Sequence, residues 1–152
     1  MNLSGNEALL DRQLVAFFAS RSASEGADNL ARQWAYDISL SDKIVISGFH
    51  SPIERLVLDV LLSQGASVVV AIGRSLYRRI PLHLQSAYDE GRVLFISFRD
   101  YDRPSFSNSQ LRNWAVAALA EQIVFAPFEP LSQLSTLYYS LSRGATPTVI
   151  LQ

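Results

Sequence analysis

Short apolar runs recur along this chain, and segments with helical character separate them. Six runs have the length of a buried β-strand: residues 14–20, 43–48, 66–73, 93–98, 122–126 and 147–151. Strands that are apolar on both faces and alternate with helices are typical of a parallel sheet that helices cover on each side. Because crossovers between parallel strands are right-handed, the pattern predicts an α/β fold. We expect an open, doubly wound, mostly parallel, Rossmann-like sheet of about six strands with helices on both faces.

The segments between these runs carry signals for helix starts and ends. The clearest lies at Ser51, where a serine cap precedes Pro52 at the first helical position and Glu54 at the third, as in a capping box. The other helices are expected over residues 24–40, 82–90, 110–120 and 131–143. Residues 99–109 are predicted to form a polar loop. Residues 1–12 are predicted to be a polar lead-in with one helical turn at Glu7–Asp11.

The length of 152 residues suits a single domain over residues 1–152. No run of about eighteen apolar residues is present, and the first residues lack a basic segment followed by an apolar one, so we expect a cytoplasmic protein without a membrane partner. Cysteine is absent and His50 and His83 are the only histidines, which argues against a metal site and a thiol nucleophile. The net charge of −1 means that any polyanion would need a local basic patch. Lys43 is the only lysine; this arginine bias suits phosphate recognition and equally fits a GC-rich genome.

Small, hydroxyl-bearing and arginine residues follow the predicted strands. In open parallel sheets, ligands bind in the crevice outside the carboxyl ends of the strands, where backbone amides and arginine forks can hold phosphate. The candidate residues at this edge are Ser20, Arg21, Ser47, Gly48, Phe49, His50 and Arg74. The alternatives stay open: Ser47 and Gly48 also suit a simple tight turn, the arginines also suit a solvated surface, and His50 also suits a structural role.

The absence of known motifs argues against several enzyme classes. The chain has neither a G-x-G-x-x-G fingerprint nor a Walker A motif, which argues against a dinucleotide dehydrogenase and a P-loop ATPase. No paired carboxylates and no nucleophile–base pair stand out. We therefore expect no catalytic residue and no cofactor.

Four segments resemble the Rossmann-like domain of the DNA-processing protein A family, over roughly residues 13–152. They are VAFFASRSAS, KIVISGFHSPIERLVLDVLLSQGASVVVAIGRSL, RIPLHLQSAYDEGRVLFIS and LRNWAVAALAEQIVFA. The last segment carries an Arg-Asn pair at Arg112 and Asn113. A wider superfamily also includes the "lonely guy" phosphoribohydrolases, which are often described as lysine decarboxylase-like.

The resemblance implies a pocket at the strand ends, which relatives in that family use for single-stranded DNA and other members use for nucleotides. It adds Arg112, Asn113 and Thr136 to the candidate ligand-binding residues. The chain departs from the family pattern at Ala19, where a glycine is expected, and at Ser132 and Gln133, where a glycine-rich turn is expected. The Pro-Gly-Gly-x-Gly-Thr loop and following glutamate of the phosphoribohydrolases are absent, so hydrolysis of a glycosidic bond is not expected.

Three functions follow as hypotheses. The first is a non-catalytic module that binds a nucleotide or another phosphate ligand through Arg21, Arg74 and Arg112, with the amides of Ser47 and Gly48 as donors. The second is a single-stranded DNA-binding protein related to DNA uptake or recombination. The third and least favoured is a phosphoribohydrolase-type enzyme that uses Glu129 or His50. A homodimer is also expected, through a helix face with Ala115, Ala118 and Leu119.

Overall fold

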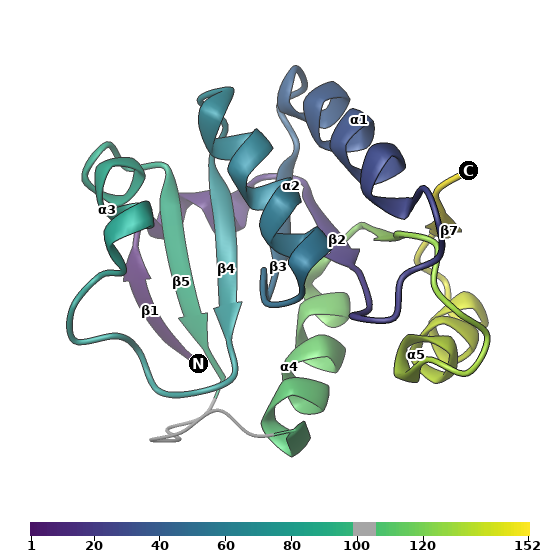
Figure 1. Ribbon diagram of the computed structural model, residues 1–152. Coiled ribbons are helices and arrows are strands. Elements are labelled where there is room, and N and C mark those ends of the chain that lie inside the picture. Colours follow the sequence, from purple (N-terminus) through teal and green to yellow (C-terminus); the bar gives the residue numbers. More distant parts are fainter. Residues whose placement is uncertain (99–105) are drawn as a thin grey trace.

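The fold is that of a computed structural model, which describes residues 1–98 and 106–152. A seven-stranded sheet in the order β1-β5-β4-β3-β2-β6-β7 forms its centre (Figure 1). The strands are β1 (Asn2–Gly5), β2 (Leu14–Phe18), β3 (Ile44–Ser47), β4 (Val68–Ile72), β5 (Val93–Ser97), β6 (Gln122–Phe125) and β7 (Thr148–Ile150). All neighbouring strands pair in parallel except β1, which is antiparallel to β5. The predicted α/β class and the mostly parallel sheet are confirmed.

The edge strand β1 is absent from the sequence prediction, which treats this segment as a polar lead-in. Its four residues contain a single large apolar side chain, Leu3, and therefore no alternating pattern. The strand forms because its backbone pairs with β5, with Asn2 opposite Ser97. The predicted helical turn that follows is present as a 3₁₀ helix, η1 (Glu7–Asp11).

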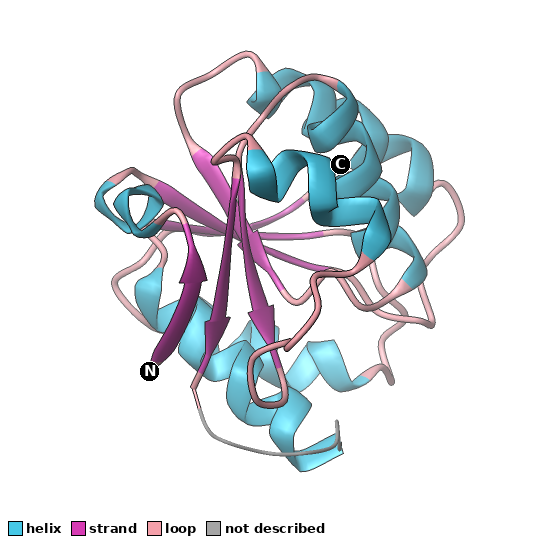
Figure 2. Ribbon diagram, turned by 90° about the vertical axis from the view of Figure 1, so that its left-hand side faces the viewer, coloured by secondary structure: helices cyan, strands magenta, loops and turns pink. Residues whose placement is uncertain are grey.

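Helices cover both faces of the sheet, as Figure 2 shows. The helices are α1 (Ala27–Ser39), α2 (Pro52–Ser63), α3 (Leu82–Asp89), α4 (Phe106–Leu119) and α5 (Gln133–Ser142). The first three pack on one face, and α4 and α5 pack with η1 on the other. Helix α4 begins four residues earlier than predicted, because serine and asparagine lower helix propensity only modestly. The rest of the predicted polar loop, residues 99–105, lies outside the described residues.

The core consists of two apolar layers, one under each set of helices. The strands β2, β4 and β5 are buried along their whole length, which explains why they read as continuous apolar runs. On α1 the most buried positions are Ala27, Ala31 and Ala35, whose small side chains bring the helix close to the sheet. Trp34 stacks on Phe17 with ring centroids 4.9 Å apart. No helix in the described part of the chain is both long and apolar enough to cross a membrane.

The direction of chain progression reverses beside β2. The chain moves outward from β2 through β3 and β4 to β5, and then crosses back to place β6 on the other side of β2. Loops that leave β2 and β6 therefore turn toward opposite faces, which opens a crevice at their carboxyl ends. In Figure 1 the carboxyl ends of β4 and β5 point downward, toward the edge where α4 lies.

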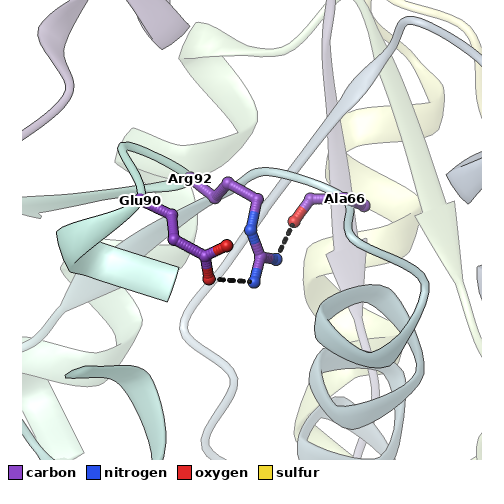
Figure 3. Close-up of polar contacts among 3 residues, drawn as sticks. All are labelled: Ala66, Glu90 and Arg92. Atoms are coloured by element: carbon purple, nitrogen blue, oxygen red, sulfur yellow. Dashed lines mark hydrogen bonds and ion pairs between the residues drawn. The ribbon is translucent and has the colours of Figure 1, made fainter. Parts of the chain in front are cut away.

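The amino ends of the parallel strands form the opposite edge of the sheet. There Arg12 donates to the carbonyl oxygen of Asp42, whereas Arg92 has a carboxylate partner. Arg92, just before β5, donates from Nη2 to Oε1 of Glu90 (3.0 Å) and from Nη1 to the carbonyl oxygen of Ala66 (3.0 Å), as drawn in Figure 3. This is the only ion pair among the described residues. Arginines at the carboxyl edge have no such partner within the described part.

Candidate functional site

A cavity of about 790 Å³ lies at the carboxyl ends of the strands, beside the point where the chain reverses. Four segments line it: the loop after β2, the start of α2, part of α4 and the first turn of α5 with the residues before it. The lining residues are Ala19, Ser20, Arg21, Ser22, His50, Ser51, Glu54, Gln110, Arg112, Asn113, Trp114, Leu131, Ser132, Gln133, Leu134, Thr136 and Leu137. Chain reversal in an open α/β sheet thus creates a cavity where ligands generally bind.

Arg112 is the buried cation of this cavity. Only 8% of the residue is exposed, and its guanidinium donates from Nε and Nη2 to Oδ1 of Asn113, at 3.3 and 3.2 Å. No carboxylate lies within ion-pair distance of it among residues 1–98 and 106–152. Burial lowers the pKa of Arg112, and the more distant charge of Glu54 opposes that shift. A buried cation whose neighbour is a neutral amide gains electrostatic energy from any anion that enters the cavity.

Gly48 gives the guanidinium the space it occupies. A Cβ atom on Gly48 would lie 2.6 Å from Cζ and 2.8 Å from Nε of Arg112, closer than real Cβ contacts. A side chain at this position would displace the guanidinium, so glycine after β3 permits the close approach of Arg112. The next residue, Phe49, has φ 48°, a left-handed conformation that is costly for a bulky residue. Its side chain is buried, and its N–H donates to Oγ of Ser47 (3.1 Å).

Glu54 ties the loops after β2 and β3 together. The predicted capping box with Ser51 is present. The carboxylate also accepts hydrogen bonds from the backbone N–H groups of Ala19 (Oε2, 3.0 Å) and His50 (Oε1, 2.9 Å). A third contact, from the N–H of Ser51 to Oε1, measures 3.3 Å. One buried side chain thus fixes two edges of the cavity relative to each other.

Two further basic side chains, His50 and Arg21, line the cavity from exposed positions. The pKa of His50 is lowered, chiefly by partial desolvation at the cavity and then by the positive charges of Arg112 and Arg21. These effects favour the neutral form of its imidazole. A bound anion would offset both arginine charges and raise this pKa, so an anion favours protonation of His50.

The first turn of α5 opens onto the cavity. Ser132 is its N-cap residue but makes no side-chain capping bond, and its Oγ is a buried atom without a hydrogen-bond partner in the described structure. The first N–H groups of a helix have no partner within the helix, and here Gln133 and Leu134 line the cavity. A helix N-terminus with its partial positive charge is suited to an anion. Thr136 also lines this wall.

The sequence-predicted residues fall into three groups. Those that line the cavity are Ser20, Arg21, His50, Arg112, Asn113 and Thr136. Ser47, Gly48 and Phe49 do not line it: the hydroxyl oxygen of Ser47 accepts from the N–H of Phe49, and Gly48 lies against the guanidinium of Arg112. Arg74 does not line the cavity; its guanidinium lies 5.3 Å from the ring centroid of Tyr77, and its carbonyl accepts a hydrogen bond from Ser97. The proposed cluster of three arginines is thus a cluster of two, and its ligand-binding role stays a prediction.

Several residues that line the cavity are not among the predicted site residues, and they include Glu54, Ser132 and Trp114. The capping pattern accounts for Glu54 at the start of α2, but the sequence does not show that its second oxygen reaches Ala19, which is 35 positions away. Ser132 stands where the family pattern has a glycine-rich turn, and that pattern gives no sign of its buried hydroxyl. Trp114 follows the predicted pair Arg112 and Asn113 directly, which is the one signal that could have found it.

Comparison with solved structures shows which known folds are similar. DNA processing protein A from Helicobacter pylori, described in a study of its single-stranded DNA binding mode, aligns with a TM-score of 0.78 and 17% identity over 97% of this chain and 69% of that chain. DNA processing protein A from Streptococcus pneumoniae aligns with a TM-score of 0.78 and 20% identity, over 97% of this chain and 53% of that chain. The present chain therefore spans about half to two thirds of these proteins. The molybdenum cofactor carrier protein from Chlamydomonas reinhardtii is more distant, with a TM-score of 0.58 and 12% identity.

At the level of sequence, comparison with curated proteins found no match. A family model does match: that of DNA recombination-mediator protein A covers residues 1–136. This range contains η1 and six of the seven strands. It also contains every residue that lines the cavity except Leu137. The resemblance inferred from the strand ends is thereby confirmed, and this chain belongs to the DNA recombination-mediator protein A family.

Proposed function

We propose that this protein binds single-stranded DNA by holding a backbone phosphate in the cavity beside β2. The observation that carries the proposal is Arg112, a buried guanidinium at the chain reversal without a carboxylate partner among the described residues. A phosphate diester would supply the missing negative charge and accept charge-assisted hydrogen bonds. The family and the printed description of the Helicobacter pylori relative support a single strand as the source of that phosphate.

Three donors would share the phosphate. Arg112 contacts it from the floor of the cavity, Arg21 from the exposed rim, and the first turn of α5 from the side. The predicted amide donors, those of Ser47 and Gly48, belong to residues that do not line the cavity. The next three N–H groups, those of Phe49, His50 and Ser51, already donate to Ser47 and Glu54. The helix N-terminus therefore replaces the Ser47-Gly48 turn as the expected backbone donor.

Salt dependence tests this proposal. Each phosphate contact on a single strand contributes about 0.7 to the slope of log affinity against log salt concentration. Arg21→Ala should therefore lower the slope for an oligothymidine strand by about 0.7, with weaker binding at low salt. Fluorescence anisotropy at several salt concentrations measures it. Arg32→Ala is the matched control, because Arg32 is exposed on α1 away from the cavity and should leave the slope unchanged. Equal slopes for the parent and Arg21→Ala would contradict a phosphate contact at this rim.

The cavity volume supports a second candidate, a free nucleotide or another small phosphate ligand. About 790 Å³ lies within the usual range for small-molecule sites. A mononucleotide that displaces oligothymidine at micromolar concentration would favour this function over a strand-binding role.

The expected dimer face on α4 stays a prediction; of its residues, Leu119 packs against the core and Ala118 is exposed.

A further inference from the structure

Two of the apolar side chains that line the cavity are also exposed to solvent. Trp114 on α4 is 48% exposed, and Leu131, just before α5, is 98% exposed. Both line the cavity, which also holds Arg21 and Arg112. Nothing in the packing of the core requires an indole or an isobutyl group at these positions, since neither belongs to a core layer.

We propose that Trp114 is the nucleobase contact of this site, with Leu131 as a second apolar contact, so that the cavity selects base-bearing phosphates over bare ones. The proposal rests on the proposed function, because it assumes that Arg112 holds a phosphate of the same ligand. Trp114 lies two positions after Arg112 on α4, and both residues line the cavity, so a charged and an aromatic group are available to the same ligand.

The chemistry of a single strand fits this pair of groups. An unpaired base exposes a flat apolar face, and its phosphate lies within one nucleotide of it. An indole stacks on any base, because every base has a π-face, and such contacts are largely independent of sequence. Asn113, between the two groups in sequence, accepts from Arg112 with its Oδ1, and its amide NH₂ has no acceptor among the described residues, so it can donate to a ligand. The site would therefore read the presence of a base and not its identity.

A comparison of two strands separates the base contact from the phosphate contact. The first is oligothymidine, and the second is an abasic strand of the same length with the same phosphodiester backbone. The parent protein should bind oligothymidine at least about tenfold more tightly, and Trp114→Ala should remove most of this preference, with Leu131 retaining the remainder. Trp114→Phe should keep part of the preference. Tyr36→Ala, which removes an aromatic side chain of similar exposure on α1, should change neither affinity.

A second measurement does not depend on whether the alanine variant folds. Trp34, stacked on Phe17, is the only other tryptophan, so Trp34→Phe leaves Trp114 as the sole indole. Its fluorescence should be quenched by oligothymidine and not by the abasic strand.

The outcomes distinguish the two proposals. Equal affinity of the parent for both strands, or an unquenched Trp114 with oligothymidine bound, overturns the base contact and leaves the phosphate site intact. Failure of the parent to bind either strand overturns the proposed function and the base contact with it.

Discussion

Replacing Arg112 with methionine should weaken the binding of single-stranded DNA by about tenfold to a hundredfold without lowering the stability of the fold. Hydrogen bonds to charged groups contribute about 1.5–3 kcal/mol, which corresponds to that range of affinity. Stability should hold or rise, because methionine fills a similar volume and removes a buried charge that has no carboxylate partner in the described structure. Anisotropy with oligothymidine and a thermal melt of the free protein measure the two effects.

Gly48→Ala tests the position of the Arg112 guanidinium by changing the residue against which it lies. Its Cβ would force the guanidinium of Arg112 out of its position, so this variant should also bind DNA more weakly although it changes no charge. Arg143→Met, in the C-cap of α5 and away from the cavity, is the control for loss of a positive charge. Parent-like affinity of Arg112→Met would remove Arg112 from the site, and a strongly destabilised variant would show that its charge has a structural partner.

Replacing Glu54 with alanine should cost about 3–5 kcal/mol of the free energy of unfolding. The carboxylate is buried and accepts hydrogen bonds from backbone groups of two loops, and its loss leaves buried N–H groups without an acceptor. The substitution also removes a negative charge that attracts the buried guanidinium of Arg112, so the burial of that cation becomes more costly. Urea unfolding followed by circular dichroism measures the change.

Two control variants set the scale for this loss of stability. Glu54→Gln keeps one oxygen acceptor and should lose less stability than the alanine variant. Glu90→Ala breaks the exposed ion pair with Arg92 and should cost less than about 1 kcal/mol. If Glu54→Ala unfolds at the same urea concentration as Glu90→Ala, Glu54 does not connect the two loops as described.

The fold was largely predictable because its elements carry local signals. The buried strands are visible in the sequence as apolar runs. Ser51, Pro52 and Glu54 form a capping pattern that marks the start of α2. Strand β1 could not be predicted, because an edge strand held by backbone pairing needs no apolar pattern. On α1 the large apolar residues Leu30, Trp34 and Ile38 are spaced four apart, yet the alanines are the most buried, because close packing on a sheet favours small side chains.

The site was predictable only in part, because strand order decides which strand ends meet. The sequence places Arg74 after a strand, as it does Arg21, but β4 lies two strands away from β2 in the sheet. Arg112, in contrast, lines the cavity but does not follow a strand. It lies on α4, so only the family resemblance predicted it as a site residue. The hydrogen bond from Ala19 to Glu54 and the position of Trp114 at the cavity depend on packing between segments far apart in sequence.

A crystal structure of the protein with a bound oligothymidine strand tests the central claim most directly. We expect a backbone phosphate with an oxygen within about 3 Å of the Arg112 guanidinium and close to the first turn of α5. A strand bound on another face, with no phosphate at Arg112, would contradict the claim.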